Sequence, residues 1–223
     1  MTISEPTSVG TDPYLTPRAS SSALVLIDVQ RDFYEDDAPA RIDGTAAVIP
    51  AMAQLVHLFR RQGRPIVHVV RLYRRDGSNV DLVRRHAVES GAQIAVPGSE
   101  GSQIAPELLP GAVELEHERL LAGQSQQVGP AEYVMYKPRW GAFYGTGLEQ
   151  HLRASGVDTI VFAGCNFPNC PRTSIYEASE RDFRTVLVSD AMSGLYPRGA
   201  EECRAIGVHV RTLADVSTWL TTD

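Results

Sequence analysis

The 223-residue chain is poor in cysteine, in long apolar runs and in positive charge. Its three cysteines cannot all pair with one another, so we expect no disulfide framework and a reducing compartment, the cytoplasm. No segment approaches the roughly 18 apolar residues that span a bilayer, and the first twenty residues lack the apolar core of a signal peptide. The net charge of −6 argues against nucleic acid as the main partner.

The histidines also lack the spacing of a metal site. We therefore expect no metal and no other cofactor. One of them, His68, lies inside an apolar run and is interpreted as a core histidine. The full set is His57, His68, His86, His117, His151 and His209.

What the chain does contain, from about residue 21, is an alternation of short apolar runs with helical periods. Strands separated by helices imply right-handed crossovers and a mainly parallel sheet that is covered on both faces. We expect one doubly wound α/β domain with six strands over residues 21–223, after a flexible arm over residues 1–20. The expected strands are 23–29, 65–70, 133–137, 159–163, 185–189 and 208–211, and the expected helices are 42–62, capped by Asp43, 148–155, 170–182, 199–206 and 216–220.

Residues 71–131 are the least regular part of the chain. Long ordered connections in compact domains usually have a function, so we expect at least a dimer with this region in the interface. The alternative is a lid over the chain's own active site. Its arginines could bind an anionic substrate, contact a neighbouring subunit or form a solvated charged face. They are Arg71, Arg74, Arg75, Arg84 and Arg85.

Reactive side chains stand at the ends of three expected strands. Asp28 interrupts one apolar run, Lys137 ends another, and Cys170 follows a third after an irregular turn. Ligands of open parallel sheets bind beyond the carboxyl ends of the strands, so we expect the three to meet in one pocket. Taken singly, Asp28 could form a turn, Lys137 could be solvated, and Cys170 could be a small buried hydrophobe.

The position of Cys170 suits a nucleophile. Pro171 fits the first position of a helix, which makes Cys170 the expected N-cap, where the helix dipole would lower the pKa of the thiol. Asp28 could accept and return a proton, and Lys137 could balance the charges. Two backbone N–H groups of the turn at residues 164–170 could form an oxyanion hole. This set suits attack on an amide carbonyl, with a thioester that water then hydrolyses.

Three segments of the chain resemble the isochorismatase-like cysteine hydrolases. They are Leu-Ile-Asp-Val-Gln-Arg-Asp-Phe at 26–33, Lys-Pro-Arg-Trp-Gly-Ala-Phe at 137–143 and Gly-Cys-Asn-Phe-Pro-Asn-Cys at 164–170. The resemblance covers about residues 21–220. It implies an Asp28–Lys137–Cys170 triad, a cis peptide between Cys165 and Asn166, and an oxyanion hole formed by the amides of Asn166 and Cys170. It also implies a small-molecule amide as substrate and a homodimer or homotetramer.

The sequence departs from the family pattern in places. The turn Asn-Phe-Pro-Asn-Cys-Pro is unusual, which puts the substrate rim near residues 166–172 in doubt. The Asp-x-His pair with which nicotinamidases bind a metal does not follow Phe33. True isochorismatases cleave a vinyl ether without a cysteine nucleophile and are disfavoured by Cys170. The segment at 72–85, with Asn-Cys-Pro-Arg-Thr-Ser, resembles the streptothricin hydrolase subgroup, which acts on a cyclic amide.

The substrate is less constrained than the chemistry. Amides of carbamoyl, ureido or maleamate type are the other family options. A non-catalytic binding protein on the same fold, or a redox protein using Cys165 as a resolving thiol, remain alternatives. Aromatic residues near the expected triad could contact the substrate, although core packing could equally explain several of them. The candidates are Phe33, Trp140, Phe143, Tyr144 and Phe167.

Overall fold

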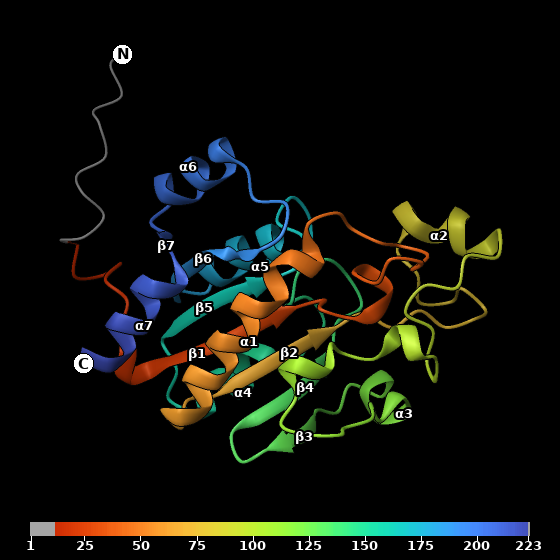
Figure 1. The fold of residues 1–223 in the computed structure, drawn as a ribbon, viewed down its shortest axis with the longest axis horizontal. Helices are drawn as coiled ribbons and strands as arrows, with labels where there is room; N and C mark the ends of the chain where they lie inside the picture. Colours follow the sequence, from red (N-terminus) through yellow and green to blue (C-terminus); the bar gives the residue numbers. More distant parts are fainter. Residues whose placement is uncertain (1–11, 223) are drawn as a thin grey trace.

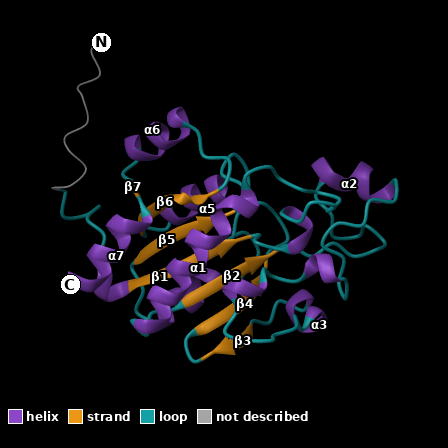
Figure 2. Ribbon diagram, in the orientation of Figure 1, coloured by secondary structure: helices purple, strands orange, loops and turns teal. Residues whose placement is uncertain are grey.

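A seven-stranded sheet forms the middle of the computed structural model, which describes residues 12–222 (Figures 1 and 2). Its strand order is β3-β4-β2-β1-β5-β6-β7. Neighbouring strands are parallel except for β3, which pairs antiparallel with β4. The strands are β1 Ser22–Ile27, β2 Ile66–Val70, β3 Gln126–Gly129, β4 Glu132–Tyr136, β5 Thr159–Gly164, β6 Arg184–Met192 and β7 His209–Arg211.

Helices cover both faces of this sheet, which confirms the doubly wound α/β class. Helices α1 and α7 pack on one face, whereas α4, α5 and α6 contribute to the core on the other. No helix among residues 12–222 is both long and apolar enough to cross a membrane. The helices are α1 Thr45–Arg61, α2 Leu82–Glu89, α3 His117–Leu121, α4 Leu148–Ala154, α5 Cys170–Ser179, α6 Pro197–Ala205 and α7 Leu213–Thr222.

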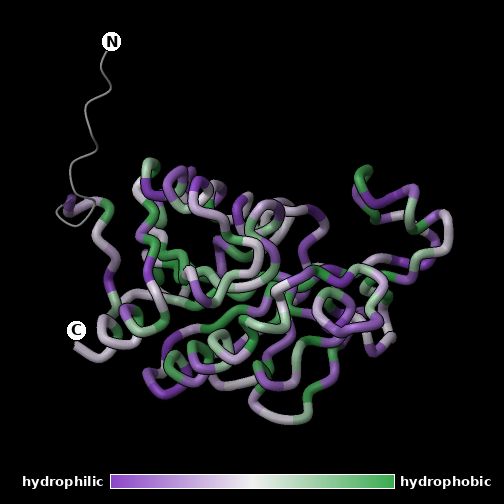
Figure 3. The backbone as a smooth tube through the Cα atoms, turned by 45° about the horizontal axis from the view of Figure 1, so that its top comes forward, coloured by the Kyte–Doolittle hydropathy of each residue, from purple (hydrophilic) through white to green (hydrophobic). Residues whose placement is uncertain are grey.

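The alternation of side chains along β1 explains the two cores. Leu24 and Leu26 pack with α1 and α7, whereas Val25 and Ile27 pack with α4 and α5. All six residues of β1 are buried, as expected for a central parallel strand that is covered on both sides. Each such aliphatic side chain contributes roughly 1.5–3 kcal/mol when it leaves water. Figure 3 shows the apolar stretches gathered in the body of the molecule, with the α2 segment standing apart from it.

The chain order places the strand ends that matter side by side. After β1 the chain builds β2 and β4 on one side and then crosses to β5 on the other side of β1. Strand order therefore reverses at β1, and the carboxyl ends of β4, β2, β1 and β5 lie in one row. At the last residue of β5, Gly164 has a φ of +132°, and a Cβ there would lie 2.4 Å from the Ile27 carbonyl oxygen. Only glycine allows this close approach of the two strands.

The structure corrects several expected boundaries. The sheet has seven strands rather than six, because β3 lies within the region 71–131. Helix α1 begins at Thr45, and its N-cap is Gly44, with a φ of +80° that glycine adopts freely, rather than Asp43. Of the expected arm, residues 1–11 lie outside the described residues, whereas Arg18 contacts the domain through a backbone hydrogen bond to Thr159.

A buried polar network connects β2, β4 and α1. Glu132 receives two hydrogen bonds of 2.7 Å from Arg60, and its Oε1 lies 2.7 Å from Nε2 of His68. His68, expected to be a core histidine, is 2% exposed. Burial alone would raise the pKa of Glu132, but the hydrogen bonds from Arg60 and His68 lower it below its ordinary 4.5.

We expect Glu132→Gln to destabilise the protein by about 1–3 kcal/mol at pH 7, because the buried partners lose a charged acceptor. A carboxylate whose pKa is lowered on folding contributes stability that is present above its ordinary pKa, 4.5 for Glu132, and is lost as the pH falls through the folded value. The difference between wild type and variant should therefore narrow in acid. Urea unfolding from pH 7 down to pH 3 measures this. Glu201→Gln, on the exposed side of α6, is the control, and a constant difference over this range would contradict the prediction.

Candidate active site

Four neighbouring strands end beside one pocket: three of the residues that follow them line it, and the fourth, Lys137, is buried behind Asp28. Asp28 follows β1, Arg71 follows β2, Lys137 follows β4, and Cys165 follows β5. Backbone hydrogen bonds continue one residue past the strands, from Asp28 to Val69 at 2.9 Å and from Cys165 to Ile27 at 2.9 Å. These bonds hold the backbone of the site in place. The sheet itself therefore positions the reactive groups.

The central contact of the site is a buried ion pair. Lys137 Nζ lies 2.7 Å from Asp28 Oδ2, and the two side chains are 0% and 7% exposed. A buried lysine is costly unless it is paired, so this pair accounts for the lysine at the end of an apolar strand. The second carboxylate oxygen, Asp28 Oδ1, is buried without a hydrogen-bond partner among the described residues. Asp28 also has a φ of +53°, a backbone conformation that is uncommon outside glycine.

Cys170 is the first residue of α5, and the N-cap is Asn169, one position earlier than the N-cap expected at Cys170. Burial, followed by the Asp28 carboxylate, raises the pKa of the thiol, although Lys137 and Arg71 act in the opposite direction. The expected lowering of this pKa by the helix terminus is therefore wrong, because desolvation and the nearby carboxylate outweigh it. The raised pKa favours the neutral thiol, and among the described residues Asp28 Oδ1 has no hydrogen-bond partner.

Arg71 also lines the cavity, although the sequence pattern placed it only among the arginines of the region 71–131. It is 2% exposed, and its guanidinium donates to Asp81 at 2.9 Å and to the Pro138 carbonyl at 3.1 Å. Its other nitrogen lies 3.7 Å from Cys170 Sγ. Tyr73 donates a further 2.9 Å hydrogen bond to Asp81. Burial lowers the pKa of Arg71, but nearby groups, Asp28 first among them, raise it by more. The guanidinium therefore stays positive beside the sulfur.

Two backbone N–H groups in the turn before α5 remain available. Among the described residues, neither the amide of Asn166 nor that of Cys170 donates a hydrogen bond. Both residues line the cavity that contains Asp28. The peptide bond between Cys165 and Asn166 is cis, and the next amide, Phe167, is occupied by the Ser193 carbonyl at 2.8 Å. Unpaired amides beside a nucleophile are the donor type that binds a developing oxyanion.

The five aromatic candidates separate into two groups. Phe33 and Trp140 line the cavity beside Cys170. The other three do not reach it. Phe143 packs against Phe183 in the core, Phe167 packs against Tyr196, and Tyr144 is 60% exposed. Core packing explains two of these three, since both rings lie in the cluster on the α4–α5 face.

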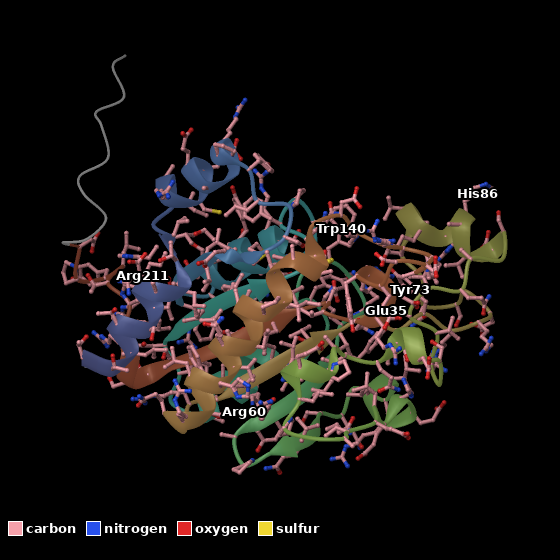
Figure 4. The ribbon with its side chains drawn as sticks, viewed as in Figure 1. Glu35, Arg60, Tyr73, His86, Trp140 and Arg211 are labelled. Atoms are coloured by element: carbon pink, nitrogen blue, oxygen red, sulfur yellow. The ribbon has the colours of Figure 1, made fainter. Side chains whose placement is uncertain are left out.

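The cavity itself is narrow. Its volume is about 20 Å³, which is room for about one water molecule. Side chains from the region 71–131 close it on one side: Tyr73 is buried in its wall, and Arg84 from α2 joins Trp140 among its partly exposed lining residues. Figure 4 shows Tyr73 and Trp140 on the side of the molecule that carries α2. A substrate must displace rim side chains to reach Cys170.

Metal-binding groups do not gather at this site. Within residues 12–222, no three His, Cys, Asp or Glu side chains are arranged to hold a metal ion. The three cysteines are free thiols, and both Cys165 and Cys203 are buried. The reactive groups of this site are a thiol, a carboxylate and a buried lysine.

The chain is similar to one protein family and to several known proteins. The family model described as "Isochorismatase domain" matches residues 22–218. A probable inactive nicotinamidase of Arabidopsis thaliana is 30% identical over 208 residues, which are 91% of this chain and 98% of that protein. A maleamate amidohydrolase of Pseudomonas putida is 28% identical over 172 residues, 76% of this chain and 71% of that protein.

Among solved structures, an isochorismatase family protein from Desulfovibrio vulgaris superimposes with a TM-score of 0.76 and 33% identity. The match covers 90% of this chain and 98% of the other. The family match over residues 22–218 contains every strand of the sheet and the whole row of strand ends described above. The chain belongs to the isochorismatase family.

Proposed function

We propose that this protein is an amidohydrolase that cleaves the C–N bond of a small-molecule amide through a thioester on Cys170. The observation that carries the proposal is the meeting of Cys170 with the Asp28–Lys137 ion pair and Arg71 at the switch point of the sheet. The name of the maleamate-hydrolysing relative supports an amide as the substrate. Cyclic amides and carbamoyl or ureido amides share the same scissile group.

The first half of the reaction forms the thioester. Because the pKa of Cys170 is raised, the thiol needs a base during attack, and the unpartnered Asp28 Oδ1 accepts its proton. The sulfur bonds to the amide carbon as the carbonyl π electrons move to oxygen, where the amides of Asn166 and Cys170 donate to the oxyanion. The intermediate collapses, the C–N bond breaks, and Asp28 returns the proton to the leaving nitrogen.

The second half releases the acid. A water molecule gives a proton to Asp28 and attacks the thioester carbon, and the C–S bond breaks with the electron pair on sulfur. The proton on Asp28 then returns to the Cys170 thiolate. During both halves Lys137 stays on Oδ2, and Arg71 lies beside the sulfur, so positive charge faces the thiolate whenever it forms.

An acid-quench experiment tests the proposal. The protein is mixed with a panel of primary, cyclic and ureido amides, quenched within milliseconds and measured by intact-mass spectrometry. In parallel, ammonia release is followed for the primary and ureido amides, and the ring-opened product is followed for the cyclic amides. We expect an acyl adduct that maps to Cys170 and release of the amine at the same rate. Ammonia release without any adduct on Cys170, even when turnover is slowed at low temperature, would refute the thioester route.

A non-catalytic or redox-active binding protein on the same fold is the second candidate, favoured by the name of the Arabidopsis relative, a probable inactive nicotinamidase. A redox role would use Cys165 as the resolving thiol for Cys170. Burial raises the pKa of Cys165 to about 12, so its thiolate is scarce at neutral pH and disulfide exchange would be slow. With free thiols only, we further infer a reducing compartment such as the cytoplasm.

Assembly is a separate inference: we infer a homodimer or homotetramer in which the region 71–131 contributes to the interface. Helix α2 stands apart from the body of the molecule (Figure 1), and it exposes Leu82 and Val83, at 82% and 67%. Apolar side chains of this size at a protruding point are typical of a surface that meets another chain. The alternative is that α2 closes over its own active site as a lid.

Light scattering across a dilution series distinguishes the two. We expect a mass of at least twice 24.4 kDa at micromolar concentration, and a shift toward the monomer for Leu82→Asp combined with Val83→Asp. Charged residues on an interface core cost affinity because they must be desolvated. A wild-type mass that stays near 24.4 kDa would refute the oligomer.

A further inference from the structure

One of the positively charged side chains at the cavity beside Cys170 has no negatively charged partner among the described residues. Lys137 is paired with Asp28, and Arg71 is paired with Asp81. Arg84 also lines the cavity, but within residues 12–222 its side chain makes no ion pair or hydrogen bond. With Cys170 as a neutral thiol, the site therefore has an unbalanced positive charge in a chain whose net charge is −6.

The helix geometry directs Arg84 inward. Val88, one helical turn later, is buried in the cluster with Tyr73 and Phe33, and positions i and i+4 share a face of a helix. His86, two positions after Arg84 and thus on the opposite face, is exposed and points away from the molecule in Figure 4. The exposure of Arg84 lies between that of Val88 and that of His86, so its side chain is partly buried.

The neighbouring Arg85 behaves differently. Its guanidinium donates to the Val80 carbonyl at 3.0 Å, within the loop that leads into α2, and it is not among the residues that line the cavity. Two adjacent residues of the same type therefore have different tasks. Arg85 stabilises the loop, whereas Arg84 presents an unused guanidinium to the cavity.

Arg84 reaches the cavity from α2, whereas the sulfur lies at the start of α5, beside Arg71. The charges that chiefly shift the pKa of Cys170 are those of Asp28, Lys137 and Arg71. Arg84 instead influences Tyr73, whose pKa is raised mainly by burial and lowered in part by this arginine. Arg84 thus lies on the α2 side of the cavity, where it can meet a substrate group other than the scissile carbonyl.

We propose that Arg84 binds a carboxylate at the distal end of the substrate and so selects anionic amides over neutral ones. This inference rests on the proposed amidohydrolase function. A guanidinium offers two parallel N–H groups that match a carboxylate, and the walls beside it, Phe33 and Tyr73, are closed to bulk water. A local cation also attracts anions that the net charge of the chain would otherwise repel.

A pair of matched amides tests the selection. Succinamate and butyramide have the same chain length, but only succinamate has a carboxylate. We expect Arg84→Ala to lower the ratio of kcat/KM for succinamate to that for butyramide by about 10- to 100-fold, as for a lost charge-assisted hydrogen bond, and Arg84→Lys to recover part of it. Arg85→Ala should leave the ratio unchanged. An equal ratio in wild type and Arg84→Ala would overturn the assignment.

A second measurement does not depend on turnover. Alkylation of Cys170 by iodoacetamide is followed by mass spectrometry with increasing succinate or, as the neutral probe, butane-1,4-diol. We expect succinate to protect wild type and Arg85→Ala, with at least a tenfold weaker effect in Arg84→Ala. This pattern supports Arg84 even if neither amide is hydrolysed, a result that would count against the proposed function alone. No protection of the wild type, or equal protection of both variants, would overturn the assignment.

Discussion

We expect the replacement of Cys170 by alanine to abolish amide hydrolysis, with a loss of at least about 10³-fold in kcat, because the proposed covalent route has no other nucleophile. Neither of the other thiols can substitute for it: Cys203 is buried away from the cavity, and Cys165, although it lines the cavity, has a pKa that burial raises to about 12. The fold should survive, because Cys170 is partly exposed and loses only one sulfur atom at the start of α5. The measurement is ammonia release from the best amide of the panel, with a melting temperature for each protein.

Cys203→Ala is the matched control for this experiment. Its thiol lies in α6, packs into the core on the α4–α5 face and is not among the residues that line the cavity. We expect nearly full activity with a modest loss of stability, as for a small change in a packed core. Retained hydrolysis in Cys170→Ala, or a comparable loss in Cys203→Ala, would show that the nucleophile is assigned wrongly.

Asp28→Asn should lower kcat by about 10²- to 10⁴-fold, the range in which positioned acid–base groups contribute. The amide cannot accept the thiol proton that Asp28 Oδ1 is free to take. The same change leaves Lys137, 0% exposed, without its counter-charge, which costs roughly 3–5 kcal/mol of stability. Activity must therefore be measured well below the melting temperature of the variant, and expressed per folded protein.

A second substitution separates the two effects. Adding Lys137→Met to Asp28→Asn removes the uncompensated charge and should raise the melting temperature above that of the single variant, because an apolar residue of similar volume suits the buried position. Activity should remain absent in both. Recovery of hydrolysis along with stability would mean that Asp28 has a structural role only.

The rule that exposes the site from sequence is the position after each apolar strand. It places Asp28 and Lys137, which the structure brings to 2.7 Å from each other. The same rule applies to Arg71 directly after β2, but we grouped that arginine with the charges that follow it in sequence. Position relative to the sheet, rather than proximity along the chain, decides which arginine reaches the sulfur.

Proximity along the chain also misled the aromatic assignment. Phe143 and Tyr144 follow Lys137 closely, yet one ring enters the core and the other faces solvent, because adjacent residues of a turn point in different directions. Strand β3 was not predicted from the sequence, for a related reason. As a partly exposed edge strand that begins with Gln126 and Gln127, it needs no apolar run, so the periodicity that predicts central strands is missing from it.

The two edges of the sheet have a consequence for behaviour at high concentration. Strand β7 has three residues, and β3 has four, with an irregular register between Gln127 and Gly129. Short or kinked borders are poor templates for an incoming strand of another chain. The central strands are long and almost wholly apolar, and would aggregate readily if they were uncovered. Their protection lies in these truncated borders, so insertions that lengthen β3 or β7 would be expected to favour fibrils.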